Sequence, residues 1–176
     1  MPFLFAVFVD DLVEIVNKAN IGCRVGVLCT AIFMYADDIV LLAPSVYALQ
    51  SLVNLCESEL SFLDMAVNAS KSCCLRFGPK FDSVCAPVVC KEKIIHWVNS
   101  SRYLGVCLIS SFNFKCSFHK NKVGFFKAFN SIYGKLGNCA SEEVLFALIR
   151  SKCLPILYYG TDVCPNSRTS SHCNLR

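Results

Sequence analysis

The sequence predicts an α+β chain in which a sheet with packed helices precedes an all-helical part. Three observations support this class. Apolar residues recur at helical intervals in residues 3–19 and 49–63, β-branched and aromatic runs fill the segments 22–44 and 72–109, and helical spacing returns after residue 111. The chain has 176 residues, of which 55% are hydrophobic and 17% charged, so it can bury a core. This composition excludes a disordered or collagen-like protein.

The first half of the chain is predicted to hold two helices on either side of a tight β-hairpin. Residues 3–19 form the first helix, with Asp10 and Asp11 on its polar side. Two apolar runs, residues 31–35 and 39–43, are separated by the three residues Ala-Asp-Asp, a pattern typical of a hairpin. Ser45 is the expected N-cap of a helix of about 20 residues that ends at Asn68.

The second half is predicted to continue as sheet and then to become helical. Strands are expected at residues 72–77, 94–98 and 103–109. An apolar stripe then runs from Phe118 to Leu136, with Lys120 and Lys127 off the stripe. Ser141, followed by two glutamates, is the expected hydroxyl cap of a last helix that stops before Pro155.

Charge is distributed unevenly along the chain. Residues 1–100 carry seven Lys and Arg against ten Asp and Glu, whereas residues 101–176 carry ten against three. An acidic part beside a basic part suits a metal site next to a surface that binds a polyanion. The 13 cysteines contain no C-x-x-C pair, so we expect reduced thiols in the core.

The sequence predicts neither a membrane span nor a secretory signal. The longest nearly apolar stretch, residues 25–36, is shorter than the roughly 18 residues that cross a bilayer. The apolar amino-terminal segment has no basic region before it. We therefore expect an intracellular protein, in the nucleus or the cytoplasm, without a membrane partner.

Two adjacent carboxylates, Asp37 and Asp38, stand between very apolar runs. Unpaired carboxylates beside buried strands are costly, and a divalent cation such as Mg²⁺ or Mn²⁺ is one partner that offsets them. The alternative is a turn in which both side chains face solvent. Asp10 and Asp11 are also adjacent, but on a helix such neighbours diverge by about 100°, so we expect a structural or surface role for them.

Five phrases, in this order, resemble the reverse transcriptases of non-long-terminal-repeat retrotransposons and the related group II intron proteins. They are P-F-L-F-A with V-D-D-L at residues 2–12, Y-A-D-D at 35–38, N-A-S-K-S at 68–72, R-Y-L-G-V at 102–106 and P-I-L-Y-Y-G at 155–160. The resemblance implies a partial right-hand polymerase. Its palm, an antiparallel sheet with packed helices, would span residues 1–112, its helical thumb 113–162, and a polar tail 163–176.

The resemblance also implies an activity and its partners. The activity is RNA-directed DNA polymerisation by two-metal nucleotidyl transfer. The implied partners are an RNA template, a DNA primer and deoxynucleoside triphosphates. The implied cofactor is Mg²⁺ or Mn²⁺, expected only in the complete enzyme.

Family motifs assign roles to individual residues. Asp37 matches a metal ligand and Asp38 its weaker neighbour, and Lys71 matches a proton donor or electrostatic clamp near the triphosphate. Tyr103 and Gly105 match the primer grip. Without the family motif, Lys71 is a surface lysine after a helix, and the other two are an ordinary strand residue and a bulge.

Three further residues are expected to contact nucleic acid. Tyr35 belongs to the Y-A-D-D phrase, and Lys120 and Lys127 match a thumb helix that follows a nucleic-acid backbone. The alternative for the lysines is a solvated helix face. The phenylalanines of the same segment are expected in the thumb core rather than as stacking platforms.

Family enzymes carry an earlier strand with a third catalytic aspartate and a fingers region, and no segment of this sequence matches either. We therefore expect a truncated reverse transcriptase domain that is inactive alone. The alternative is a non-enzymatic fragment that binds nucleic acid through the basic thumb. A third reading is a decayed product with no function.

Overall fold

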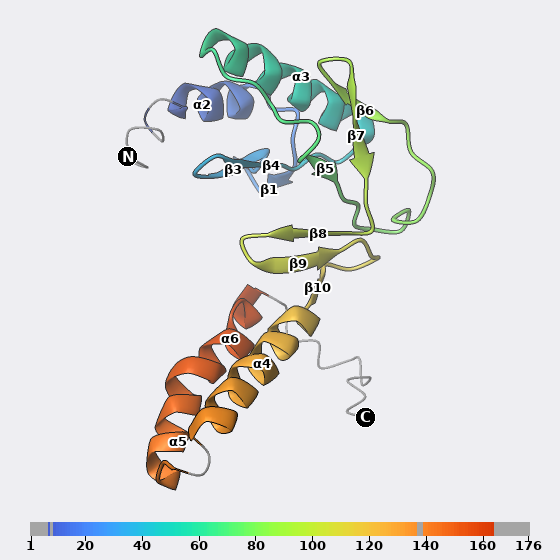
Figure 1. Cartoon of the computed structure of the whole chain (residues 1–176). Coiled ribbons are helices and arrows are strands. Elements are labelled where there is room, and N and C mark those ends of the chain that lie inside the picture. Colours follow the sequence, from blue (N-terminus) through green and yellow to red (C-terminus); the bar gives the residue numbers. More distant parts are fainter. Residues whose placement is uncertain (1–6, 8, 137–138, 164–176) are drawn as a thin grey trace. The chain divides into compact units, whose positions relative to one another are not determined.

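The computed structural model describes residue 7 and residues 9–136 and 139–163, and divides the chain into two compact units (Figure 1). The first unit comprises the residues up to 74 and residues 83–98. The second comprises residues 75–82 and those from 99 onward. Helices and small, mostly antiparallel sheets make the described chain a mixed α+β protein, which confirms the predicted class. The bounds 1–112 and 113–162 for palm and thumb stay a prediction.

Two helices and a hairpin form the first core. Helix α2 (Asp10–Ala19) and helix α3 (Val46–Phe62) contact each other and the hairpin of β3 (Ile32–Tyr35) and β4 (Asp38–Leu41). The buried residues of this core come from all three elements. The predicted first helix is confirmed from Asp10, and its predicted start at residue 3 lies outside the described residues.

Helix α3 begins as predicted but ends early. The Ala48 N–H donates to Ser45 Oγ at 3.1 Å, so Ser45 is the N-cap. The helix ends at Phe62 rather than near Asn68, because Asp64 adopts a left-handed φ of 54°. The Asp64 N–H then donates to Ser61 O at 3.2 Å and the Met65 N–H to Leu60 O at 2.8 Å. This is a Schellman-type end, in which Asp takes the position usually held by Gly.

The remaining strands of the first unit are short. Strands β1 (Arg24–Val25) and β2 (Leu28–Cys29) pair antiparallel. A second sheet has the order β5-β7-β6, with β5 (Cys73–Cys74), β6 (Val88–Cys90) and β7 (Lys93–Trp97). Strand β7 confirms the strand predicted at residues 94–98. The strand predicted at 72–77 is reduced to β5, which pairs parallel with β7.

The prediction that the cysteines lie in the core is confirmed for only some of the described ones. Cys56, Cys74, Cys90 and Cys153 are buried, whereas Cys73 and Cys139 are exposed. Burial raises the pKa of the Cys56 thiol from 9.0 to about 12, and the neighbouring Cys90 and Glu59 act in the same direction. The folded chain therefore holds Cys56 as a neutral thiol at neutral pH.

Alkaline pH should destabilise the fold through Cys56. The raised pKa stabilises the folded state fully below pH 9, where the thiol is neutral in both states, and this stability is lost as pH rises toward 12. We expect the free energy of unfolding to fall by about 1 kcal/mol between pH 8 and pH 10 from this thiol alone. Urea denaturation in reductant at both pH values measures the loss. The Cys56→Ala chain should show a smaller pH-dependent loss, and an equal loss would contradict the assignment to Cys56.

The second unit begins with an antiparallel sheet of order β10-β9-β8. Strands β8 (Ser100–Tyr103) and β9 (Val106–Ile109) form a hairpin with a two-residue loop, and β10 (Lys115–Ser117) pairs with β9. The strand predicted over residues 103–109 is confirmed only for Val106–Ile109, because Tyr103 ends the preceding strand. Leu104 and Gly105 both have positive φ, at 45° and 83°, so the chain reverses there.

In the described residues, the second unit continues with three α-helices, a π-helical turn and a short 3-10 helix (Thr161–Val163). Helix α4 (His119–Leu136) confirms the predicted helix, and α5 (Glu142–Leu148) starts after Ser141, although the Ser141 hydroxyl makes no cap bond. The predicted stop before Pro155 is wrong. A π-helix (Ile149–Cys153) leads directly into α6 (Leu154–Tyr158), with Pro155 in its first turn, where a missing N–H is tolerated.

The phenylalanines of α4 are less buried than predicted. No residue of this helix is fully buried, and Phe126 is 59% exposed. Phe125, Phe129 and Tyr133 instead form a ladder of stacked rings along the helix. Among the described residues, no helix is both long and apolar enough to cross a membrane.

Candidate functional site

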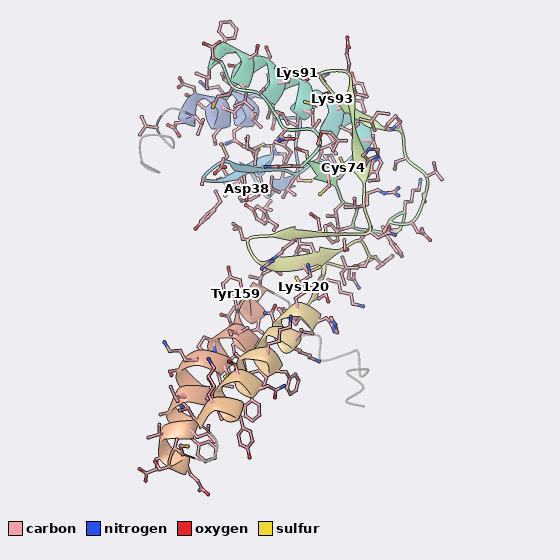
Figure 2. All side chains as sticks on the ribbon, in the orientation of Figure 1. Asp38, Cys74, Lys91, Lys93, Lys120 and Tyr159 are labelled. Atoms are coloured by element: carbon pink, nitrogen blue, oxygen red, sulfur yellow. The ribbon has the colours of Figure 1, made fainter. Side chains whose placement is uncertain are left out.

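The β3–β4 hairpin presents the two adjacent aspartates at its turn. Tyr35 pairs with Asp38, so the loop contains only Ala36 and Asp37, and Asp38 is the first residue of β4. Ala36 has a positive φ of 50°, a conformation that non-glycine residues adopt rarely. Both carboxylates and Tyr35 are exposed at this end of the hairpin, and Figure 2 labels Asp38 there.

The base of the hairpin is held by backbone contacts with the segment that follows α2. The Leu42 N–H donates to Ala31 O at 2.8 Å, and the Cys23 N–H donates to Leu42 O at 3.0 Å. Gly22 is buried here, and a Cβ on it would overlap Ala31 Cβ and lie 2.9 Å from Leu42 O. Only glycine therefore lets the chain pass this close to the base of the hairpin.

The donor set of the turn suits a hard divalent cation. Magnesium is usually bound by one or two carboxylates, with waters and substrate phosphates in its other positions. Asp37 and Asp38 supply two carboxylates that solvent can reach. Within residues 7, 9–136 and 139–163, no three His, Cys, Asp or Glu side chains are grouped to hold a metal ion. The turn thus presents two exposed carboxylates, which by themselves would fill only part of the coordination shell of such a cation.

Lys71 lies in the same unit, on an exposed turn built by Asn68. The Lys71 N–H donates to Asn68 O at 3.1 Å and to its Oδ1 at 3.2 Å, and the Ser72 hydroxyl donates to Asn68 O at 2.9 Å. The Lys71 side chain is exposed, and in the described part of the chain no ion pair joins it to Asp37 or Asp38. Its ammonium is therefore accessible to an anionic ligand.

Tyr103 and Gly105 lie on the β8–β9 hairpin of the second unit, where Gly105 is tightly covered. A Cβ on Gly105 would lie 2.8 Å from Tyr159 Cε1. The Tyr159 hydroxyl donates to Leu104 O at 2.8 Å, and the Asn121 side-chain amide donates to Tyr159 O at 2.9 Å. Tyr159, which directly follows α6, therefore holds the turn in place, and Asn121 of α4 in turn holds Tyr159.

Sequence reasoning did not assign this bracing role to Tyr159. The Y-Y-G phrase at residues 158–160 was recognised, but nothing local links it to a turn that lies 55 residues earlier. Gly160 belongs to the same contact, since a Cβ on it would lie 2.6 Å from Val106 Cγ2. Gly105, Tyr159 and Gly160 belong to separate sequence motifs, but they lie at one contact between the β8–β9 hairpin and the segment after α6.

Lys120 and Lys127 are exposed on α4, as the sequence predicted. This helix also carries Lys122 and Lys135 and contains no Asp or Glu. Lys120 is near the start of the helix and Tyr159 directly follows α6 (Figure 2).

The predicted site residues are divided between the two units. Tyr35, Asp37 and Asp38 lie on one hairpin of the first unit, with Lys71 elsewhere in that unit. Tyr103, Gly105 and the two lysines belong to the second unit.

Comparison with known families gives one match. The family model described as "Reverse transcriptase (RNA-dependent DNA polymerase)" matches residues 1–108. This range contains the aspartate turn, Lys71 and the Leu104–Gly105 turn, but not α4 with Lys120 and Lys127. No curated protein and no solved structure matches significantly.

Proposed function

Because the chain belongs to the reverse transcriptase (RNA-dependent DNA polymerase) family, we propose that it is a partial polymerase domain of the non-long-terminal-repeat retrotransposon type. Its palm would comprise residues 1–112 and its thumb residues 113–162. The observation that carries the proposal is the exposed Asp37–Asp38 pair at a two-residue turn, inside the range that matches the family. The family implies binding of a nucleic-acid template and primer.

The residues of the first unit would hold the reacting groups. Asp37 and Asp38 would bind Mg²⁺ or Mn²⁺ together with the phosphates of a deoxynucleoside triphosphate. When bound, such ions activate the primer hydroxyl and offset the charge that develops on the leaving pyrophosphate. Lys71 would add a positive charge near the triphosphate, and the exposed ring of Tyr35 would contact the nucleic acid beside the turn.

The second unit would bind the primer–template duplex. Tyr103 and Gly105 would form part of a primer grip at the β8–β9 hairpin, whose turn Tyr159 holds in place. Lys120 and Lys127 are exposed on a helix without acidic residues, which suits contact with phosphates. Phosphate contacts of this kind contribute affinity without base sequence preference.

We further propose that the 176-residue chain does not polymerise by itself. One turn supplies two carboxylates, and the described residues place no third ligand with them. Two-metal transfer requires both ions to be held against the reacting oxygens, which two side chains from one turn do not achieve alone. The purified chain should therefore show no extension of a DNA primer on an RNA template in Mg²⁺ or Mn²⁺, and measurable extension would contradict this part of the proposal.

Metal binding can be tested without activity. Paramagnetic Mn²⁺ should broaden the amide signals of Asp37 and Asp38 in the NMR spectrum of the full chain, and this broadening should disappear in the Asp37→Asn/Asp38→Asn chain. Asp10 and Asp11 are the matched control, because they are also adjacent and exposed but lie on a helix. Equal broadening at both pairs would contradict a specific site at the turn.

A non-enzymatic nucleic-acid-binding fragment is the second candidate, favoured by the acid-free helix α4. Fluorescence anisotropy with a labelled RNA–DNA hybrid separates the parts of the proposal. The Lys120→Ala/Lys127→Ala chain should bind more weakly, with a salt slope lower by about 1 to 2. Replacement of the exposed Lys93 by Ala is the control and should leave the slope unchanged. Unchanged binding after loss of both thumb lysines would rule out this surface.

A further inference from the structure

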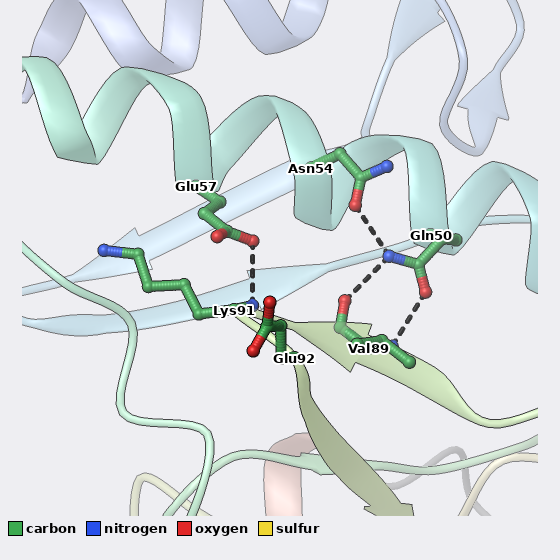
Figure 3. Close-up of a pocket in the computed structure, with 6 residues that line it drawn as sticks. All are labelled: Gln50, Asn54, Glu57, Val89, Lys91 and Glu92. Carbon is green, nitrogen blue, oxygen red and sulfur yellow. Dashed lines mark hydrogen bonds between the residues drawn. The ribbon is translucent and has the colours of Figure 1, made fainter.

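The outer edge of β6 is covered by side chains of α3 rather than by another strand. Strand β6 is the last strand of the β5-β7-β6 sheet, and only β7 pairs with it. An uncovered edge presents free N–H and C=O groups to which another chain can add a strand. Figure 3 shows that the described structure fills this position with residues of one helix, Gln50, Asn54 and Glu57.

Gln50 bonds to both backbone groups of Val89, the middle residue of β6. Its Nε2 donates to Val89 O at 2.7 Å, and its Oε1 accepts from the Val89 N–H at 2.8 Å. A residue of an adjoining antiparallel strand makes the same reciprocal pair of bonds. The Val89↔Ile94 pair of the β6–β7 ladder leaves these two groups pointing outward, so Gln50 takes the place of a neighbouring strand.

Two more α3 residues extend this arrangement along the edge. Asn54, one helical turn after Gln50, accepts a second bond from Gln50 Nε2 at 2.7 Å and so orients the amide. Glu57 Oε2 accepts from the N–H of Lys91 at 3.2 Å, and Lys91 is the first residue of the turn that follows β6. The N–H groups of residues 89 and 91 are therefore both bonded to α3.

Without the Gln50 side chain, β6 would have an open edge, and its residues favour pairing with β6 of another copy. Its three residues, Val88, Val89 and Cys90, are uncharged, and two of them are β-branched. An antiparallel pair of β6 strands from two copies would satisfy a two-fold axis and could put the Val89 groups of both copies in one ladder. A second copy of this chain is thus the partner that fits the uncovered edge.

We infer that Gln50 prevents strand pairing between two copies of the chain. Its amide bonds to the N–H and C=O of Val89, the backbone groups that would otherwise pair with β6 of a second copy. This role is separate from polymerisation and does not rest on the metal site. It explains why a polar side chain near the start of α3 bonds to backbone 39 residues away, rather than pointing into solvent.

The test compares the full-length chain with its Gln50→Ala variant. Sedimentation velocity should give the variant a larger fraction of dimers or higher oligomers than the wild type at equal concentration. The Val89 amide should exchange with solvent about tenfold faster, or more, in dilute variant than in wild type. Ser51→Ala is the matched control, since the Ser51 hydroxyl bonds only to Tyr47 O in the same helix. It should change neither measurement.

A second variant and a wild-type measurement keep the test decisive. Adding Val89→Pro to Gln50→Ala removes the outward N–H, so association should return to the wild-type level. A Gln50→Ala chain that is folded and no more associated than wild type would overturn the inference. If this variant does not fold, the wild-type chain decides, since a Val89 amide that exchanges at the rate of an unprotected peptide would equally overturn it.

Discussion

Replacing Gly22 with alanine should unfold the first unit or displace its hairpin, with a loss of about 3 kcal/mol or more in the free energy of unfolding. The added Cβ would overlap Ala31 Cβ, and the carbonyl of Leu42 would be 2.9 Å away. Both neighbours belong to the hydrogen-bonded base of the β3–β4 hairpin, so neither can move without breaking backbone bonds. The aspartate turn should lose its position with them.

The sole tryptophan of the chain reports on this change. Trp97 lies in the first unit, where its Nε1 donates to Ala86 O at 3.0 Å, and its fluorescence can follow urea denaturation. Gly26→Ala is the matched control, because Gly26 has open space around it and only its φ of 61° opposes a side chain. We expect that control to lose about 1 kcal/mol. A Gly22→Ala chain as stable as the control would contradict the packing argument.

Replacing Gly105 with alanine should cost the second unit about 2–4 kcal/mol. Two effects add here, since the φ of 83° is unfavourable for alanine and the new Cβ would press on the Tyr159 ring from 2.8 Å. The turn at Leu104–Gly105 should then lose its brace. Helical circular dichroism reports on both units, since α2 and α3 lie in the first and α4, α5 and α6 in the second, whereas Trp97 fluorescence reports on the first. The effect is therefore measured as the loss of helical signal that precedes the change in Trp97 fluorescence during denaturation.

Two companion variants separate the causes. In a Tyr159→Ala background the ring is absent, so Gly105→Ala should cost at least about 1 kcal/mol less than in the wild type. Gly134→Ala is the control for the substitution itself, because its Cβ would meet nothing within 4 Å in helix α4. It should stabilise the chain by about 0.5–1 kcal/mol. Equal costs for Gly105→Ala with and without the ring would contradict a steric role of Tyr159.

Several parts of the candidate site were predictable because their signals are local. Apolar runs on either side of Ala36-Asp37-Asp38 predict the hairpin, which is found, and both carboxylates are exposed there, whereas the sequence left metal binding and a solvent-facing turn as alternatives. Apolar spacing predicts α4 and places Lys120 and Lys127 on its polar side. The roles of Asp37, Asp38, Lys71, Tyr103 and the two lysines stay predictions, to which the family match lends support for the residues up to 108.

Other parts were not predictable because they depend on backbone conformations that the residue type does not demand. Asp64 ends α3 in a left-handed conformation where glycine is the usual signal, so the helix was predicted too long. Leu104 likewise adopts a positive φ in the β8–β9 turn, although its residue type is typical of a continuous strand. Pro155 marks a helix end in most sequences, but the π-helical turn before it lets the helix continue.

By itself, the sequence determined the α+β class, the reverse transcriptase family and the turn that carries the paired aspartates. The class and the turn follow from short-range patterns of apolar, turn and acidic residues, which act between neighbours in the chain. The family instead follows from the resemblance of five motif phrases and from the match over residues 1–108. Only the tertiary structure decided that Tyr159 braces the Leu104–Gly105 turn and that Gln50 closes the edge at Val89. Those contacts join residues 55 and 39 positions apart, and they form only once packing of the helices on the sheets has brought the partners together.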